Sequence, residues 1–283
     1  MPAIVHSLEE LQGIRETWRS AGESVALVPT MGSLHEGHKA LVVEATSQAD
    51  RCVVSIFVNP LQFGAGEDFD AYPRSLHADE AFLADTLVDV IFAPSVEVMY
   101  PEGLDAAPSL SAGRVGDTYE GASRPGHFDG VLTVVKRLFD YVDPDVAVFG
   151  AKDAQQLFLV QQMVQDQKLP LRIVEVDTVR DSSGLALSSR NAQLSETPLA
   201  QALEIPRALE EASHQPSAKD ARNRAREILE SAPGVEVDYV EVVDPDTFQP
   251  GGDGGVGEPA RLIVAVTIGG VRLIDNKLLH FGQ

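Results

Sequence analysis

Apolar and polar positions alternate between two textures through the first 180 residues of the chain. Short runs rich in β-branched residues predict buried strands, and they lie at 24–28, 52–58, 88–92, 146–149 and 171–176. Between them, apolar residues recur at three- and four-residue spacing, which predicts helices at 38–49, 76–86, 128–141 and 154–167. Strands that alternate with helices long enough to cross over predict an α/β fold, with a Rossmann-like, doubly wound parallel sheet.

The pattern changes after about residue 178. Two Ala- and Glu-rich helices are predicted at 198–214 and 219–231, and strands follow at 235–243, 261–268 and 271–274. We therefore expect a first domain over 1–178 and a second, smaller α+β domain over 179–283. The stretch 250–258 contains five glycines, and neither a lysine nor a helix start follows it, so a flexible hairpin loop is predicted there rather than a phosphate loop.

Composition excludes several classes of protein. The 283 residues are 44% hydrophobic, without an uninterrupted apolar run of membrane-spanning length or the features of a signal peptide, so a soluble, cytosolic protein without a membrane partner is expected. A lone cysteine, Cys52, cannot form an intrachain disulfide. With 43 acidic and 22 basic residues the net charge is −21, which disfavours nucleic acid as a partner. A small anion needs cationic and N–H groups gathered locally.

One such gathering follows the first predicted strand. The turn from Pro29 to His38 places two histidines and two glycines at the carboxyl end of a strand, where open α/β sheets bind ligands. N–H groups and the helix dipole favour an anion there, so the turn is a candidate triphosphate site. Two alternatives stay open: His35 and His38 cap and solvate a helix start, or they bind zinc, although the HExxH spacing is absent.

Further polar groups follow other predicted strands. Gln62 lies after an Asn-Pro turn and is suited to reading oxygens of a small polar substrate, although Asn-Pro is also an ordinary turn opener. Lys152 follows a strand and can meet a phosphate, whereas Asp153 and Gln156 have the spacing of a helix cap. At the predicted domain junction, the segment 184–191 combines two hydroxyls with Arg190, which could close over a triphosphate.

Together these motifs resemble the pantoate–β-alanine ligase family, within the superfamily of adenylate-forming nucleotidyltransferases with an HxGH signature. The matching runs occur in the family's order across almost the whole chain: Pro29-Thr30-Met31-Gly32 with Leu34-His35 and Gly37-His38, Ser55-Ile56-Phe57-Val58-Asn59-Pro60-Leu61-Gln62-Phe63, Arg124-Pro125-Gly126-His127-Phe128, Phe149-Gly150 with Lys152-Asp153, and Leu187-Ser188-Ser189-Arg190-Asn191. Each run is unspecific alone, but their combination is highly specific.

The resemblance implies an ATP-dependent ligase that joins pantoate to β-alanine through a pantoyl adenylate, with Mg²⁺ accompanying ATP and a homodimeric assembly. It assigns catalytic roles to His38 as proton donor and to His35, Lys152 and Arg190 as groups that stabilise charge. Pantoate and β-alanine are assigned to Gln62 and Gln156, and Asp79 is the candidate metal ligand. The implied ATP-binding residues are Met31, Gly32, Ser33, Leu34, His35, Glu36, Gly37, His38, Gly150, Ala151, Lys152, Asp153, Val179, Leu187, Ser188, Ser189 and Arg190.

Two positions depart from the family pattern, which usually has methionine at Leu187 and glutamate at Ala151. The first is an apolar exchange that affects loop packing more than phosphate chemistry. Competing functions are a related synthetase acting on another carboxylate and a nucleotide sensor without turnover. The acidic balance disfavours an aminoacyl-tRNA synthetase.

Overall fold

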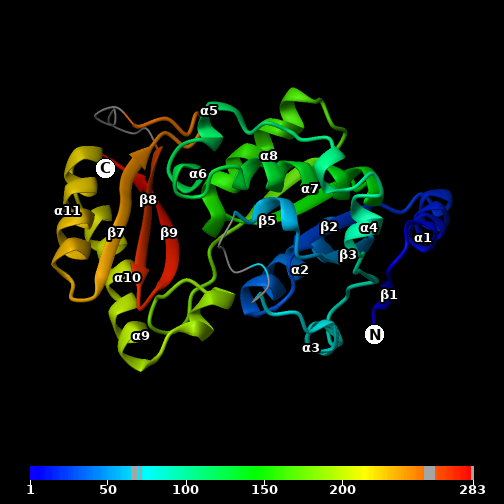
Figure 1. The fold of residues 1–283 in the computed structure, drawn as a ribbon, viewed down its shortest axis with the longest axis horizontal. Coiled ribbons are helices and arrows are strands. Elements are labelled where there is room, and N and C mark those ends of the chain that lie inside the picture. The colour runs from blue at the N-terminus through cyan, green and yellow to red at the C-terminus, as the bar shows by residue number, and fades with distance from the viewer. Residues whose placement is uncertain (65–68, 70–71, 252–258, 282–283) are drawn as a thin grey trace. The chain divides into compact units, whose positions relative to one another are not determined.

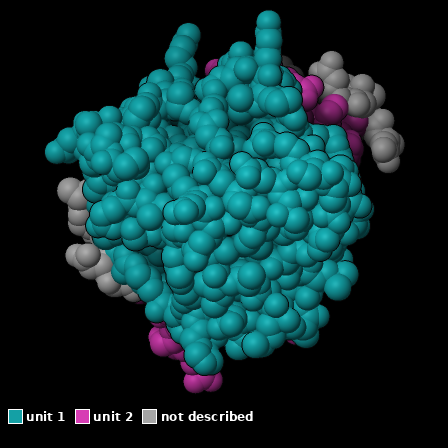
Figure 2. Space-filling view, turned by 90° about the vertical axis from the view of Figure 1, so that its right-hand side faces the viewer, with its two compact units in different colours: residues 1–151, 159–176 teal, residues 152–158, 177–283 magenta. Residues whose placement is uncertain are grey.

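A computed structural model describes residues 1–64, 69, 72–251 and 259–281. The chain divides into two compact units (Figure 1; coloured separately in Figure 2). The first unit contains Met1–Ala151 and Leu159–Val176, and the second contains Lys152–Phe158 and Asp177–Gln283. The predicted division after residue 178 lies next to the start of this last segment. Most of the predicted glycine-rich loop, 252–258, lies outside the described residues.

The first unit is built on a sheet whose paired strands are parallel, in the order β1-β4-β3-β2-β5-β6. Its strands are β1 Ala3–Val5, β2 Val25–Thr30, β3 Arg51–Ile56, β4 Val90–Phe92, β5 Val146–Gly150 and β6 Arg172–Val176. The order reverses between β2 and β5, which is the topological switch point where doubly wound sheets bind ligands beyond their carboxyl ends. The predicted Rossmann-like fold is confirmed.

Helices of the first unit cover the sheet because its strands are apolar on both sides. Val25 to Val28 are buried without a break, and alternate residues of β2 and β3 pack with Val42 and Ala45 of α2. Helix α7 packs on β2 and on α1. The helices and 3₁₀ turns are α1 Leu8–Ala21, α2 Glu36–Gln48, η1 Pro60–Gln62, α3 Leu76–Leu83, α4 Val96–Met99, η2 Leu104–Ala106, α5 Gly113–Gly116, α6 Glu120–Ser123, α7 His127–Val142, η3 Ala151–Asp153 and α8 Ala154–Asp166. The residues of η3 and of α8 are divided between the two units.

The second unit pairs helices with an antiparallel sheet in the order β7-β8-β9. Its strands are β7 Val235–Val243, β8 Pro259–Ile268 and β9 Val271–His280, and its helices are η4 Ser189–Gln193, α9 Glu196–Ala202, α10 Glu204–Ser213 and α11 Ala218–Ser231. A two-residue turn, Gly269-Gly270, joins β8 to β9 with positive φ at both positions, as tight hairpins require. One core forms between the helices and the sheet. The smaller α+β domain is confirmed.

Most predicted boundaries shift by one to three residues, and two larger differences have physical reasons. The single helix predicted over 198–214 is broken at Leu203, because Pro206 has no N–H to donate to the carbonyl of Ala202. The last strand continues six residues past the predicted end at 274, through the polar pair Asp275 and Asn276. Both side chains are buried, so polarity there does not mark the end of the strand. In the part of the chain that the structure describes, no helix has the length and apolar content to span a bilayer.

Candidate active site

The loop that follows β2 has an unusual backbone. Gly32 and Ser33 both have positive φ, +80° and +54°, so the chain turns sharply as it leaves the strand. Asp79 of α3 reaches this turn from the side: its carboxylate accepts the N–H of Ser33 at 3.1 Å and that of Leu34 at 2.8 Å. A Cβ atom at position 32 would lie 2.8 Å from the same carboxylate, so glycine is required for this close approach. The loop is therefore fixed by hydrogen bonds and by shape.

The two histidines form a reciprocal cap at the start of α2. The His35 N–H donates to Nδ1 of His38 at 3.2 Å, and the Gly37 N–H donates to Nδ1 of His35 at 3.1 Å. Both rings thus accept at Nδ1, and a neutral ring must carry its proton on Nε2. Ring centroids 4.1 Å apart show that the pair is in contact. The capping alternative is confirmed, and capping leaves each Nε2–H as the polar donor of its ring.

Asp79, the candidate metal ligand, also holds the loop that follows β2. Its side chain is buried, both oxygens accept backbone N–H groups, and desolvation raises its pKa against the opposing effect of those two bonds. Among the residues that the structure describes, no group of three or more His, Cys, Asp or Glu side chains is placed to hold a metal ion. The described residues therefore do not fit the zinc alternative, which needs at least three such ligands, and we derive no step through a metal.

Gln62 lies beside the loop after β2. Its Oε1 accepts from Asn59 at 3.2 Å, and its Nε2 donates to the Sδ atom of Met31 at 2.9 Å. Asn59 is fully buried and also accepts the hydroxyl of Tyr100 at 2.8 Å, and burial raises the pKa of that hydroxyl. The amide of Gln62 is thus oriented, but its donor faces a thioether, which is a weak acceptor. A carboxylate or hydroxyl oxygen would be a better partner for it.

A histidine of helix α7 holds the backbone of Gln62. The carbonyl of Gln62 accepts from Nδ1 of His127 at 2.8 Å. Arg124 contacts the other ring nitrogen at 3.2 Å and can only donate, so Nε2 of a neutral His127 is the acceptor and Nδ1 carries the proton. This is the opposite tautomer to that of His38. His127 therefore positions the backbone of Gln62, a contact that the sequence motif alone did not specify.

The turn after β5 carries the next candidates. Gly150 ends the strand, and the 3₁₀ turn η3 holds Ala151, Lys152 and Asp153 before α8 begins with Ala154. Nζ of Lys152 lies 3.7 Å from Asp153, so the lysine already has one acidic neighbour. Gln156 is half-buried in the first turns of α8, within the second unit.

The remaining candidates lie on a short antiparallel turn of the second unit. Leu187 donates its N–H to the carbonyl of Val179 at 2.9 Å, and Arg180 bridges to Ala186. Ser188 then caps η4 by accepting the N–H of Arg190 at 3.2 Å. The turn thereby brings Val179 beside Leu187 and leads into the half-buried residues 188–190.

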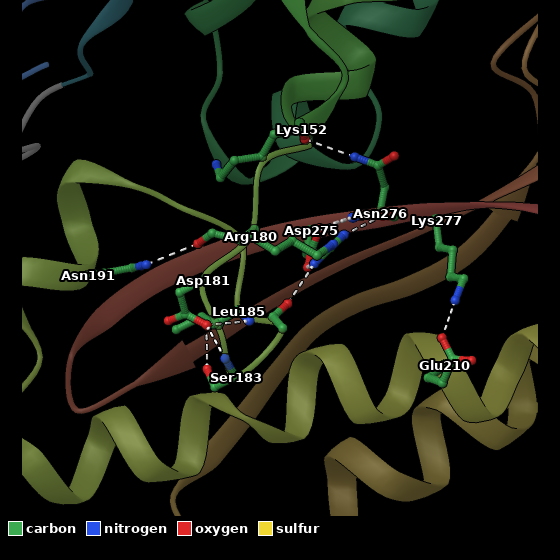
Figure 3. Close-up of polar contacts among 12 residues, drawn as sticks. Lys152, Arg180, Asp181, Ser183, Leu185, Asn191, Glu210, Asp275, Asn276 and Lys277 are labelled. Carbon is green, nitrogen blue, oxygen red and sulfur yellow. Dashed lines mark hydrogen bonds and ion pairs between the residues drawn. The ribbon is translucent and has the colours of Figure 1, made fainter. Parts of the chain in front are cut away.

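A polar network joins Arg180 and Lys152 to two residues of β9, Asp275 and Asn276 (Figure 3). Arg180 pairs with Asp275 at 2.6 and 3.0 Å, and Asn276 donates to the carbonyl of Lys152 at 2.9 Å. Sequence reasoning missed this network. A signal was present, because Asp275 and Asn276 interrupt an apolar strand pattern, but only the structure shows that both are buried.

Comparison with known proteins decides the family. The family model described as pantoate-beta-alanine ligase matches residues 3–278. The chain belongs to the pantoate–β-alanine ligase family. It is 52% identical over 285 residues to the pantothenate synthetase of Leifsonia xyli subsp. xyli, covering 98% of each chain. It is 48% identical over 289 residues to that of Nocardioides sp., covering 99% of this chain and 86% of the relative.

Solved structures of pantoate–β-alanine ligases agree with the fold. The crystal structure of pantothenate synthetase from Thermus thermophilus matches with a TM-score of 0.89 and 45% identity, over 97% of this chain and 98% of that one. The enzyme from Francisella tularensis, solved as a complex with "Beta-gamma ATP and Beta-alanine", matches with a TM-score of 0.82 and 34% identity, over 98% of both chains. The expected family and enzyme class are therefore confirmed.

Proposed function

We propose that this ligase condenses pantoate with β-alanine to pantothenate in two steps driven by ATP. The carboxylate of pantoate attacks the α-phosphorus of ATP and pyrophosphate leaves. The amine of β-alanine then attacks the acyl carbon of the pantoyl adenylate, and AMP leaves with the carboxylate-derived oxygen. The observation that carries the proposal is the histidine pair at the end of β2, whose Nδ1 atoms face the backbone and whose donors are therefore the Nε2 atoms. Membership of the family supplies the substrates.

In the first step the protein must offset charge, because a carboxylate attacks a polyanion. We assign His38 to donate a proton through Nε2 as charge develops on the phosphate, and His35 to support it. Lys152 and Arg190 add positive charge for the leaving pyrophosphate, and the hydroxyls of Ser188 and Ser189 add donors. The start of α2 contributes its dipole.

Pantoate binding is assigned to Gln62 and Gln156. Asn59 holds the Oε1 of Gln62 and Met31 accepts weakly from its Nε2, so an incoming pantoate oxygen can replace the thioether without breaking the other bond. Exclusion of water then protects the mixed anhydride until β-alanine arrives. The finer roles of Met31 to His38, Gly150 to Asp153, Val179 and Leu187 in binding ATP stay part of this proposal.

Product analysis tests the reaction. We expect AMP and pyrophosphate from ATP only when pantoate is present, and pantothenate only when β-alanine is added. ADP as the product would contradict an adenylate mechanism. Other hydroxy acids in place of pantoate separate this function from a synthetase of different specificity, and ATP binding without any turnover would favour the sensor alternative.

Substitutions at His38 can separate chemistry from capping. An asparagine side chain places an oxygen near the position of Nδ1, so His38→Asn keeps an acceptor for the His35 N–H while it removes Nε2. We expect both His38→Asn and His38→Ala to lower turnover on the order of a hundredfold or more. His214→Ala, at an exposed histidine of the second unit, is the control and should retain full activity.

Lys152→Ala should lower turnover by a similar factor, on the order of a hundredfold, with Lys219→Ala on the exposed face of α11 as its control. Near wild-type rates for either His38 variant or for Lys152→Ala, with the fold intact by circular dichroism, would contradict the assigned roles.

The proposal also includes a homodimer, a cytoplasmic location and Mg²⁺ supplied with ATP. The homodimer and Mg²⁺ follow from resemblance to the family and not from a residue pattern in this chain, whereas the cytoplasmic location is the expectation from composition. Light scattering on the purified protein measures the assembly, and titration of Mg²⁺ against fixed ATP measures the metal requirement.

A further inference from the structure

Arg180 is held by an arrangement that uses most of its guanidinium. It donates to both oxygens of Asp275, to the carbonyl of Gly184 at 3.1 Å and to the carbonyl of Asn276 at 3.3 Å. The side chain of Asp275 is only 1% exposed, and Arg180 is the ion-pair partner that compensates this buried carboxylate. The fork of donors matches the carboxylate in a way that a lysine ammonium cannot.

Asn276, the next residue on β9, extends this hydrogen-bond network to Arg261 and Lys152. Its Oδ1 accepts from Arg261 at 2.7 Å, and its Nδ2 donates to the carbonyl of Lys152 at 2.9 Å. Its own N–H donates to Asp275 at 2.8 Å. Both ends of the amide are therefore engaged, and Figure 3 shows Asn276 and Arg180 reaching from β9 and from the turn toward their partners.

The two arms of this network end at two different candidate ATP segments. One arm fixes the backbone of Lys152, a residue assigned to the leaving pyrophosphate. The other fixes Arg180, whose backbone bridges to Ala186 immediately before Leu187 and Ser188. Strand β9 thus connects two segments that lie about 35 residues apart in the chain.

We propose that Arg180, Asp275 and Asn276 are positioning residues for ATP. Their hydrogen bonds hold the turn at Lys152 and the segment that leads to Arg190 at fixed positions relative to strand β9. The inference rests on the proposed function of those two segments. A role confined to stability is the alternative, and it predicts a different result: loss of folded protein lowers the amount of active enzyme but leaves the KM for ATP unchanged.

Two substitutions test the two arms while retaining size. Arg180→Lys keeps the positive charge against Asp275 but cannot make the forked contact. Asn276→Asp keeps an acceptor for Arg261 but places an oxygen, instead of a donor, against the carbonyl of Lys152. We expect each to raise the KM for ATP about fivefold or more and to lower kcat per folded molecule, with the KM for β-alanine unchanged.

Arg272→Lys is the matched control. Arg272 is also on β9 and also forms a two-nitrogen contact with a carboxylate, but that carboxylate belongs to Asp238 of β7, which is not one of the candidate ATP segments. Its kinetic constants should equal those of the wild type. The folded fraction of every variant is measured by thermal unfolding.

Unchanged KM for ATP in both Arg180→Lys and Asn276→Asp, or an equal change in Arg272→Lys, would overturn the inference while leaving the proposed function standing. If the wild type does not turn over pantoate, the proposed function fails, and the Kd for ATP of the same variants, measured by calorimetry, then decides the positioning role. A wild type that binds no ATP would overturn both.

Discussion

Substitution of Gly130 by alanine should disrupt the support of Gln62. Gly130 lies in α7, where its helix meets the 3₁₀ turn η1 backbone to backbone. A Cβ atom there would lie 2.1 Å from the carbonyl oxygen of Leu61 and 2.7 Å from the nitrogen of Gln62. Because these are main-chain atoms, no side-chain rotation relieves the contact, and the turn that carries Gln62 must shift by about 1 Å.

The expected loss of stability in Gly130→Ala is the sum of three effects. Overpacking of this kind costs about 1–3 kcal/mol. The shift of the turn also weakens the 3.0 Å hydrogen bond from Asn59 to the carbonyl of Gly130, which destabilises the fold by about 1 kcal/mol more. Alanine returns about 0.5–1 kcal/mol through its better helix propensity. The net destabilisation is therefore about 1–3 kcal/mol.

Gly13→Ala is the matched control, because Gly13 is also inside a helix, α1, but has nothing within 4 Å of an added Cβ atom. Only the propensity gain applies there, so this variant should be more stable than the wild type by about 0.5–1 kcal/mol. At about 2–4 °C per kcal/mol, thermal unfolding should show shifts of opposite sign for the two variants.

Steady-state kinetics complete the assay. The displaced Gln62 should raise the KM for pantoate in Gly130→Ala, whereas Gly13→Ala should leave it unchanged. Equal stability of the two alanine variants, or a destabilised Gly130→Ala with an unaltered KM for pantoate, would refute the reasoning that α7 holds Gln62 in place.

Two further outcomes are expected. Gly32→Ala should lower the free energy of unfolding by about 1–3 kcal/mol more than Gly22→Ala, because both glycines have positive φ but only position 32 adds a close contact with Asp79. Equal losses in thermal unfolding would contradict the role of Asp79 in holding this loop. Burial raises the pKa of Cys52 to about 12, so this thiol should resist a disulfide reagent at pH 8 until the protein unfolds. The free energy of unfolding should also fall as pH rises from about 9 towards 12, because in that range the thiol ionises easily only in the unfolded chain. Rapid labelling of the folded protein would contradict this environment.

The sequence predicted the alternation of strands and helices because each buried strand is a compact apolar run. It did not predict β1, since Ala3–Val5 is too short to stand out from its neighbours, or the break near Pro206, which was read as part of one helical pattern. The spacing of apolar residues along the chain also cannot predict the order in which strands pair in the sheet. The reversal between β2 and β5 became visible only from the register of Ala26 with Val146.

Candidate residues of the site were found because polar groups follow strand ends and match a family pattern. What the residues do for the fold was less accessible. The sequence placed His35 and His38 at a helix start without deciding between a capping role and zinc binding, and the structure shows His35 as the cap just outside the helix. Asp79 was a candidate metal ligand only through the family resemblance, and its carboxylate accepts N–H groups of a loop some 45 residues away, a contact that no local pattern encodes.

The strand order has a consequence for synthesis of the protein. During translation β2, β3 and β4 emerge in sequence and are neighbours in the sheet, so they can begin to associate early. The other flank of β2 must wait for Val146, 120 residues later in the chain than its partner Ala26. The part of the sheet where nucleotide binding is proposed, between β2 and β5, is therefore among the last to form. A nascent chain halted before β5 would carry the histidine loop next to a β2 strand that still lacks one of its two partners.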